Sequence, residues 1–520
     1  MKTTTPSFIL ELPLRTTPVQ ESIILTRLEA GRQLYNACLD ESLERLDLLR
    51  QSKDFQQIRQ MPKGKARTKA LNDLDKKFRF TRYDIHHYAV EIRHGWIKEH
   101  INVHIAEKLA ARAFKAVQKK AFGKAKGVRF KGKNQFDTLE GQNNQTGLIF
   151  RQDIHILSWA GLEVPCIIEE KNKLIAYGLQ RRVKYCRLVR KKIKGTNRFY
   201  VQLILEGKPY QDPEKQIGTE EIGLDIGPST CAIVGDTKAE LKQFCDELVP
   251  KAIEKRKIQR KMDRQRRANN PENYNEDGTV KKGKKKWKQS NRYKKTRTKL
   301  SELDRKTAAH RKSLHGHEQN IIISQGTIIK AEEIPYRSWQ KLWGKSVSIR
   351  APSMFMKGLE RKAENARGHF YEFPTNTTRL SQTCHICGGT VKKPLSQRWH
   401  TCCNIEMQRD LYSAFLAKCV NVENNSLDIA RARMLWPCLE PVMREAVSRA
   451  YQSAIGGKIV PSSFGITTGL PRVPACCEET QSLDQRQSRS PVKSEETVTE
   501  AVDAVIEGTT YENESHREVT

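Results

Sequence analysis

The sequence lacks any apolar run long enough to cross a bilayer, which argues against an integral membrane protein. A helix that spans the hydrocarbon core needs about 20 consecutive apolar residues, and no stretch of the 520-residue chain approaches that length. The first segment, residues 1–17, carries Glu11 and Arg15 within its apolar part, so we do not expect a signal peptide. These absences predict a protein that stays inside the cell.

Acidic residues are few relative to basic ones. The chain has 60 Asp and Glu against 93 Lys and Arg, a formal net charge of +33. This excess is more than solubility needs, and a bound polyanion would lower the self-repulsion and release counterions. Nucleic acid is therefore the expected partner. An anionic membrane surface is the alternative, but the sequence offers no anchor for it.

Cysteines are also too scattered for a disulfide framework. Their number, 13, is odd, and they are dispersed except for one cluster, so a reducing compartment and a metal site are favoured. Cys384 and Cys387 lie in TCHICGG, which has the form of a zinc knuckle, and Cys402 and Cys403 follow in RWHTCC. We predict a structural zinc site formed by these four residues.

The second half of this zinc motif is irregular. Adjacent cysteines are harder to direct at one ion than the usual Cys-x-x-Cys or Cys-x-Cys spacing. His385 or His400 could replace one of the cysteines as a ligand. Alternatively the zinc site has decayed and this part of the chain is held by packing alone. Its position just before Asp410 suggests that it braces the helix that follows.

Hydrophobic patterning predicts an α/β protein of two to four structural units, because 520 residues exceed one ordinary core. Alternation predicts a strand over 7–14, and helical spacing predicts helices over 20–50 and 84–122. Between residues 127 and 210, short β-rich runs predict a small antiparallel barrel that includes the first strand. A new α/β unit begins at Ile222.

Three acidic residues stand where a strand ends or a helix begins. Asp225 lies in IGLDIG, Glu332 follows IIKA with Glu333 beside it, and Asp410 precedes the apolar run LYSAFLA. Each alone has a structural explanation, as a turn residue, a surface acid or a helix cap. Strand alternation sends Glu332 and Glu333 to opposite faces, so only one of them can join Asp225.

As a set, the three acids favour a divalent metal site. Hard ions such as Mg²⁺ prefer oxygen ligands, and paired ions about 4 Å apart stabilise the attacking and leaving oxygens of phosphodiester displacement. In a protein of net charge +33, acids without such a role would be expected to spread among the lysines as surface pairs.

The segments GLDIG, AEEI and QRDLYSAFLA, with the cysteine cluster between the last two, resemble the split RuvC domain of TnpB. TnpB is a family of transposon-encoded RNA-guided nucleases related to type V CRISPR effectors, and the resemblance covers essentially residues 1–455. It implies that Asp225, Glu332 and Asp410 are the catalytic triad and bind two Mg²⁺ ions. Asp225 and Asp410 would hold a shared ion and Glu332 its partner.

Details of the motifs both support and depart from this family pattern. Glu332 is preferred to Glu333 because the pattern is an acid, a variable polar residue and an aliphatic residue, here Ile334. Family members commonly carry an acid two positions before the last catalytic Asp and an Asn two positions after it. This chain has Gln408 and Tyr412 there. The departures leave the three acids intact but change residues near the last acid, which bears on the metal environment and on the reaction rate.

The resemblance implies a multidomain fold with an RNase H-like RuvC nuclease core, an inserted zinc ribbon and a small antiparallel β-barrel (wedge) that carries an inserted helical lobe. A disordered acidic tail is expected at the end, because residues 478–520 hold 11 Asp and Glu against 4 Lys and Arg. The expected boundaries are 1–17 for the first wedge strand, 18–126 for the helical recognition lobe, 127–218 for the wedge barrel, 219–380 for the RuvC core with its basic helices, 381–404 for the zinc ribbon, 405–455 for the C-terminal RuvC part and 456–520 for the tail.

Basic residues are densest between residues 251 and 300, with 20 Lys and Arg against 5 acids. Such a run is often only a solvated helix face, but this density with interleaved aromatics favours a groove for a nucleic-acid backbone. A second basic stretch covers residues 115–133. Other tryptophans, such as Trp96, Trp159 and Trp343, are expected to pack in cores or interfaces. The predicted nucleic-acid-binding residues are Lys284, Lys285, Lys286, Trp287, Arg292, Tyr293, Lys294 and Lys295.

Together these features predict an RNA-guided, metal-dependent DNA endonuclease of the TnpB type, associated with a transposon. Its expected cofactors are Mg²⁺ and structural Zn²⁺, and its expected partners are a guide RNA and double- and single-stranded DNA targets. Its expected location is the cytoplasm of a prokaryote, near the nucleoid. The alternatives are a non-cleaving RNA-guided or plain nucleic-acid-binding regulator on the same scaffold and a compact type V CRISPR effector.

Overall fold

The structure is a computed structural model that describes residues 5–455 and 460–466. Residues 456–459 and 467–520 of the expected acidic tail lie outside the described residues. The fold is mixed α/β, and the chain divides into two compact units, Met1–Gln211 and Asp212–Thr520. No helix in the described part of the chain is both long and apolar enough to cross a membrane. The finer boundaries expected from the sequence stay predictions.

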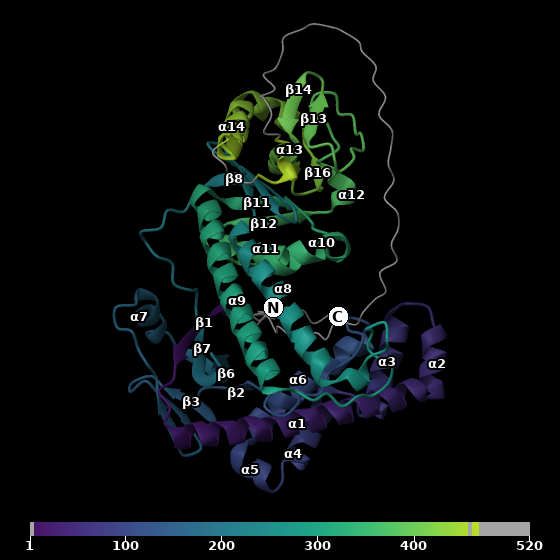
Figure 1. The fold of residues 1–520 in the computed structure, drawn as a ribbon, viewed down its shortest axis with the longest axis vertical. Helices are drawn as coiled ribbons and strands as arrows, with labels where there is room; N and C mark the ends of the chain where they lie inside the picture. The colour runs from purple at the N-terminus through teal and green to yellow at the C-terminus, as the bar shows by residue number, and fades with distance from the viewer. Residues whose placement is uncertain (1–4, 456–459, 467–520) are drawn as a thin grey trace. The chain divides into compact units, whose positions relative to one another are not determined.

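The first unit contains one long helix, α1, which packs against α6 and also contacts α2, α4 and α5 (Figure 1). The Thr17 hydroxyl and the Gln20 side chain form a capping box at the start of α1. The helical pattern expected over 84–122 is confirmed as three separate helices, because Gly95 adopts φ 55° and Asn102 caps a new helix. The helices are α1 (Pro18–Gln51), α2 (Lys53–Gln60), α3 (Lys65–Lys77), α4 (Arg82–Glu91), α5 (Trp96–His100), α6 (Val103–Ala121) and α7 (Lys173–Leu179).

Strands of the first unit form two antiparallel sheets, in the orders β1-β7-β6-β2 and β3-β4-β5. As expected, the first strand joins the later ones, since Ser7 pairs with Glu206. The expected closed barrel is wrong for the described residues, because the Gly- and Asn-rich segment 141–147 ends one sheet and starts the other. The strands are β1 (Ser7–Pro13), β2 (Thr138–Glu140), β3 (Leu148–Arg151), β4 (Ile156–Trp159), β5 (Leu162–Pro165), β6 (Val183–Ile193) and β7 (Thr196–Glu206).

The second unit is built on a five-stranded sheet of order β10-β9-β8-β11-β12. The first three strands in the chain, β8, β9 and β10, form an antiparallel meander, and β11 lies parallel to both β8 and β12. Helix α9 ends at Gln325, and β11 begins at the next residue, Gly326. The strands are β8 (Glu220–Ile226), β9 (Thr230–Val234), β10 (Ala239–Gln243), β11 (Gly326–Glu332) and β12 (His369–Phe373).

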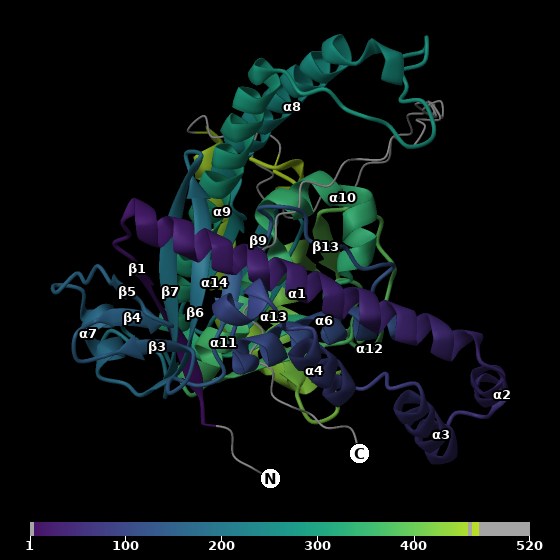
Figure 2. The same cartoon turned by 90° about the horizontal axis from the view of Figure 1, so that it is seen from below.

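Helices cover both faces of this sheet, as strand alternation requires. Ile222, Leu224 and Ile226 of β8 face one core with α9 and α11, and Ala232 and Val234 of β9 face the other with α13 and α14. The basic helices α8 and α9 lie side by side (Figures 1 and 2). The helices are α8 (Val249–Asn269), α9 (Asn291–Gln325), α10 (Tyr336–Arg350), α11 (Pro352–Asn365), α12 (Thr375–Thr378), α13 (Arg409–Lys418) and α14 (Ile429–Ile455).

A small lobe with the cysteine cluster lies between β12 and α13 in the chain. It contains the antiparallel hairpin of β13 (Trp399–Cys402) and β14 (Ile405–Gln408), which leads directly into α13. A short ladder of β15 (Val420–Asn421) and β16 (Ser426–Leu427) joins α13 to α14.

Candidate metal sites and nucleic-acid interface

Asp225 and Glu332 end two neighbouring parallel strands. In the β8–β11 ladder Leu224 pairs with Ala331, so the next residues along the two strands are Asp225 and Glu332. Paired positions on adjacent strands are about 4.8 Å apart and project to the same face. The register therefore brings these two carboxylates to one edge of the sheet, on the face that α13 covers.

Helix α13 approaches this face closely at Gly223. A β-carbon there would lie 1.9 Å from the carbonyl oxygen of Ala414, so only glycine allows the contact. Asp225 is two residues further along the strand, which is about 6.6 Å. Asp410 is four residues before Ala414, about 6 Å along the helix. Because the helix runs antiparallel to the strand, both acids extend from the contact in the same direction and by similar lengths.

Two buried lysines hold the other end of α13. The ammonium group of Lys418 donates to the Glu221 carbonyl oxygen and lies 2.8 Å from the Asp236 carboxylate. Lys330 of β11 donates to the carbonyl oxygens of Lys418 and Val420 at 3.2 and 3.0 Å. Both side chains are almost fully buried. The register of α13 on the sheet is thus set at Gly223 and by these lysines.

Asp225 has an environment that disfavours a bare negative charge. Burial raises the pKa of its carboxyl group well above the ordinary value, and the carboxylates of Asp410 and Glu332 raise it further. The nearby cation of Arg409 opposes this shift. No group among the described residues donates a hydrogen bond to the Asp225 carboxylate.

The other two acids are partly satisfied. One oxygen of Glu332, Oε1, accepts from the Thr378 hydroxyl at 3.0 Å and the Leu380 amide at 3.2 Å. Burial still raises the pKa of Glu332. Burial also raises the pKa of Asp410, while Arg409 and hydrogen bonds that include the Thr230 side chain oppose the rise. Thr230 begins β9, so this bond ties Asp410 to the turn that follows Asp225.

This donor set fits a divalent cation. A buried carboxylate that accepts no hydrogen bond and lies beside two others gains most from a positive ion. All the ligand atoms here are oxygens, which hard ions prefer. Within the described residues, the cysteine cluster is the one group of metal-ligand types whose donor atoms all lie within 4.8 Å of one another. The three carboxylates do not form a group as tight as this.

A cavity of about 250 Å³ opens where β8 and β11 end. Asp225, Glu332 and Glu333 line its acidic side, so a ligand in the cavity reaches two of the three predicted acids directly. Trp339 and Arg379 line other parts of it. Glu333 is exposed, and its amide donates to the Phe373 carbonyl oxygen at 2.8 Å.

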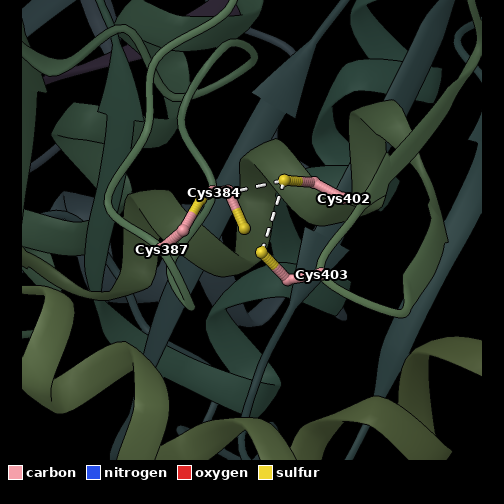
Figure 3. Close-up of side chains that lie close together, drawn as sticks. All are labelled: Cys384, Cys387, Cys402 and Cys403. Atoms are coloured by element: carbon pink, nitrogen blue, oxygen red, sulfur yellow. Dashed lines mark hydrogen bonds between the residues drawn. The ribbon is translucent and has the colours of Figure 1, made fainter.

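The four cysteine sulfurs converge as the sequence predicts (Figure 3). The Cys402 sulfur lies 3.8 Å from that of Cys387 and 3.6 Å from that of Cys403. The Gly389 amide donates to the Cys387 sulfur and, together with the neighbouring thiols, lowers the pKa of Cys387 to about 7. This cluster could hold a structural metal ion such as zinc, because thiolates are the ligands that zinc prefers.

A left-handed turn explains how two adjacent cysteines can serve one site. Cys402 pairs with Ile405 across the β13–β14 hairpin, and the two residues between them, Cys403 and Asn404, have φ values of 50° and 60°. Two consecutive positive φ angles define a type I′ turn, which usually carries Asn and Gly. The tight turn directs the Cys403 sulfur back beside that of Cys402, at the cost of an unfavourable conformation for a non-glycine residue.

The two histidines considered as substitute ligands pack instead against Tyr412. The Tyr412 hydroxyl lies 2.7 Å from Nδ1 of His385, and the His400 ring stacks on the Tyr412 ring with centroids 3.9 Å apart. Burial lowers the pKa of both histidines to about 4, so their rings are neutral at neutral pH. Tyr412 is fully buried and joins the cysteine lobe to α13.

The other departure, Gln408, is the N-cap of α13. Its side-chain oxygen accepts from the Leu411 amide at 2.8 Å, and the residue is fully buried. The side chain therefore satisfies one of the unpaired amides at the helix start, next to Asp410. Both departures from the family pattern thus have structural roles in placing the helix.

The predicted nucleic-acid-binding residues lie before and within the first turns of α9. Trp287 is 37% exposed, with the Arg266 guanidinium 5.0 Å from its ring and the Tyr274 ring edge-on to it. Trp287 thus partly packs on the loop between α8 and α9. Of the others, Lys284, Lys286, Arg292, Lys294 and Lys295 are exposed, while Lys285 and Tyr293 are half-buried.

Sequence reasoning missed several residues of these sites. Lys330 interrupts the apolar run IIKA, a pattern that can signal a buried cation with partners. Trp339 and Trp343, four residues apart, follow Glu332 closely, a spacing that places both on one face of a helix but does not reveal that Trp339 lines a cavity. As expected, Trp159 is buried, at 2% exposure, but Trp96 is 41% exposed and is not a core residue.

No family model matches the chain, and no curated protein matches it. A solved structure described as "Cryo-EM structure of the Cas12f1-sgRNA-target DNA complex" matches with a TM-score of 0.42 and 10% identity, over 79% of this chain and 98% of that one. Another, "Cryo-EM structure of CRISPR-Cas12f Ternary Complex", matches with a TM-score of 0.25 and 14% identity, over 77% and 82%. Both TM-scores are below 0.5, and neither structure is described as TnpB, so the TnpB resemblance stays a prediction.

Proposed function

We propose that this chain is an RNA-guided, metal-dependent DNA endonuclease of the TnpB type that hydrolyses phosphodiester bonds. The observation that carries the proposal is the meeting of Asp225, Glu332 and Asp410 at one edge of the sheet. The first two are neighbours through the parallel β8–β11 register. The third belongs to the helix that rests on Gly223.

The sheet order supports an RNase H-like core. A β8–β9–β10 meander followed by two parallel strands, β11 and β12, added on the other side of β8 is the arrangement that such a core requires. It places the carboxyl ends of β8 and β11 and the start of α13 at the same edge. This is the geometry expected if Asp225, Glu332 and Asp410 act as the RuvC triad.

Each acid has a distinct task in the proposed reaction. Asp225 and Asp410 would hold a shared magnesium ion, and Glu332, oriented by Thr378 and Leu380 through Oε1, would hold its partner. When bound, the ions would supply a water of lowered pKa and stabilise the charge on the attacking and leaving oxygens. The raised pKa of Asp225 indicates that its carboxylate gains strongly from a cation.

We extend the proposal to the partners and the second metal. A net charge of +33 with the exposed lysines before and within α9 suits a guide RNA and a DNA target, held through their backbones. Zinc in the cysteine cluster would brace α13 through Tyr412 and Gln408, without an open position for catalysis. A transposon or a CRISPR array beside the gene would separate TnpB from a compact type V effector.

The proposal is tested by purifying the chain with its bound RNA, sequencing that RNA and incubating the complex with a plasmid library and Mg²⁺. The expected result is cutting at sites that match the RNA, with losses of at least about 100-fold in Asp225→Ala, Glu332→Gln and Asp410→Asn. Glu333→Gln is the matched comparison, since Glu333 borders the same cavity but strand alternation turns it away from the face on which Asp225 and Glu332 lie. Its loss of cutting should be much smaller than that of Glu332→Gln.

Two outcomes would count against the proposal. Stable binding of RNA and matched DNA without cutting at any Mg²⁺ concentration would favour a non-cleaving regulator. Equal losses in Glu332→Gln and Glu333→Gln would show that the acids act through general charge rather than as a specific set. Retained RNA content in each variant, measured alongside, excludes misfolding as the cause.

A further inference from the structure

The cavity beside the predicted acids has an aromatic wall. Opposite the ends of β8 and β11, helix α10 contributes Trp339 and helix α11 contributes Met356. Trp339 is half-buried and packs against the core beneath the sheet on one side. The Trp343 ring meets it edge-on, with centroids 6.1 Å apart and planes at 89°. The indole is thus held in place from within while part of it borders the cavity.

The indole N–H of Trp339 is not bonded within the protein. None of the described residues accepts a hydrogen bond from it, and it is not among the enclosed polar atoms that lack a partner, so it is open to solvent or to a ligand. Its neighbour on the same helix, Leu342, is 68% exposed and does not line the cavity. Helix α10 therefore presents one rigid aromatic surface to the space that Asp225 and Glu332 also border.

The same cavity contains one cation, Arg379. It follows α12 in a left-handed conformation with φ 45°, and its Nε donates to the Asn376 carbonyl oxygen at 3.2 Å. The side chain is exposed, and no acidic residue of the described chain lies within ion-pair distance. A guanidinium without an acidic partner, in a cavity that carboxylates also line, suits an anionic ligand that also carries the metal ions the acids require.

We propose, on the basis of the proposed function, that Trp339 stacks on a base of an unpaired nucleic-acid strand. A phosphate of that strand lies between Arg379 and the carboxylates. A nucleotide joins a flat aromatic ring to an anion, which are the two features that the cavity walls complement. Base pairs inside a duplex are stacked on both faces and offer no free face to an indole, so the ligand is single-stranded.

The test uses the full chain with its RNA in Ca²⁺, which supports binding without rapid cutting, and strands that carry the fluorescent base 2-aminopurine. Stacking on Trp339 should quench this fluorescence. We expect Trp339→Ala to lose the quenching and to weaken binding of a short single strand about tenfold, which is about 1.4 kcal/mol. Trp339→Phe should restore most of both, and Leu342→Ala should behave as the unaltered protein.

Single-stranded DNA, single-stranded RNA and duplex DNA of the same sequence are compared. The proposal predicts Trp339-dependent quenching with one or both single strands and none with the duplex. Quenching by Trp339→Ala equal to that of the unaltered protein, or equal quenching with the duplex, would overturn it. Quenching that depends on Trp339 in a chain that never cuts would support the stacking site and contradict the proposed nuclease. Cutting and quenching that are both unchanged in Trp339→Ala would support the proposed nuclease and contradict the stacking site.

Discussion

Gly223 and Ala414 form the contact on which the predicted triad depends. A β-carbon at Gly223 would lie 1.9 Å from the Ala414 carbonyl oxygen and 2.8 Å from the Lys418 amide. No side chain can therefore occupy this position while α13 stays in place. Asp225 lies two residues after Gly223 along the strand, and Asp410 lies about one helical turn before Ala414. The distance between these acids is therefore set by a glycine that takes no part in the proposed reaction.

Replacing this glycine should separate the acids. In Gly223→Ala the helix must move outward, and we expect a loss of about 1–3 kcal/mol in the free energy of unfolding and at least a tenfold loss of cutting, measured by denaturant titration and plasmid cleavage. Gly316→Ala is the matched control, because a β-carbon there meets nothing within 4 Å. It should keep full activity. A Gly223→Ala protein as active as the control would show that this contact does not position Asp410.

The raised pKa of Asp225 predicts a dependence of stability on pH and metal. A carboxyl group whose pKa is higher in the folded state contributes its full stability below its unfolded pKa and loses it as the pH rises through the folded value. In magnesium-free buffer at neutral pH, Asp225→Asn should therefore be more stable than the unaltered protein, by an amount on the order of 1 kcal/mol. At a pH below about 3.9, the ordinary pKa of an Asp carboxyl group, the difference should vanish.

Added Mg²⁺ should reverse this order, since only the unaltered protein gains stability by binding the ion. Thermal unfolding with and without Mg²⁺ measures both effects. Glu333→Gln should respond to Mg²⁺ as the unaltered protein does. An Asp225→Asn protein less stable than the unaltered one in magnesium-free buffer would contradict the account of this carboxylate.

The turn that holds Cys403 predicts a specific difference between two variants. Cys403→Ala and Cys403→Gly both remove a thiolate, so zinc measured by mass spectrometry should fall in both. The glycine variant should be the more stable of the two by about 1 kcal/mol, because φ 50° is unfavourable for alanine. Cys438→Ser, at an exposed position outside the cluster, should keep its zinc. A full zinc content in both Cys403 variants would contradict the four-cysteine site.

Asn, the residue common in the TnpB pattern at the position of Tyr412, should destabilise this chain. Tyr412→Phe leaves the His385 amide and Nδ1 without their partner, at an expected cost of about 1–3 kcal/mol. Tyr412→Asn also empties the space between His400 and Trp436, so we expect a loss of about 3–5 kcal/mol and lower cutting. Denaturant titration measures both variants. A Tyr412→Asn protein of equal stability would show that the aromatic cluster does not support α13.

The sequence predicted what depends on local patterns. The first strand, the long basic helices and the grouping of Cys384 with Cys402 follow from alternation, helical spacing and ligand spacing. Asp225 and Glu332 each end an apolar run, which marks them as candidates, and the parallel register does make them neighbours. Their role as metal ligands stays a prediction.

Features that depend on contacts between distant segments were not predictable in this way. Gly223 appears in the sequence as one more glycine before an acid, and its need to be glycine arises only from Ala414 on another element. The expected barrel does not form because the pairing of strands depends on the packing of the whole unit, which the residue pattern of each strand does not reveal. The break at Gly95 was missed because apolar spacing continues across it, although the backbone there is left-handed.

The central claim, that three separated acids form one metal site, is tested most directly by Mn²⁺ binding. Electron paramagnetic resonance of the zinc-loaded protein should show Mn²⁺ bound, with affinity lowered at least about tenfold in Asp225→Asn, Glu332→Gln and Asp410→Asn. Glu333→Gln should bind Mn²⁺ as the unaltered protein does. Binding that is unchanged in all three variants, or lost equally in Glu333→Gln, would contradict the claim.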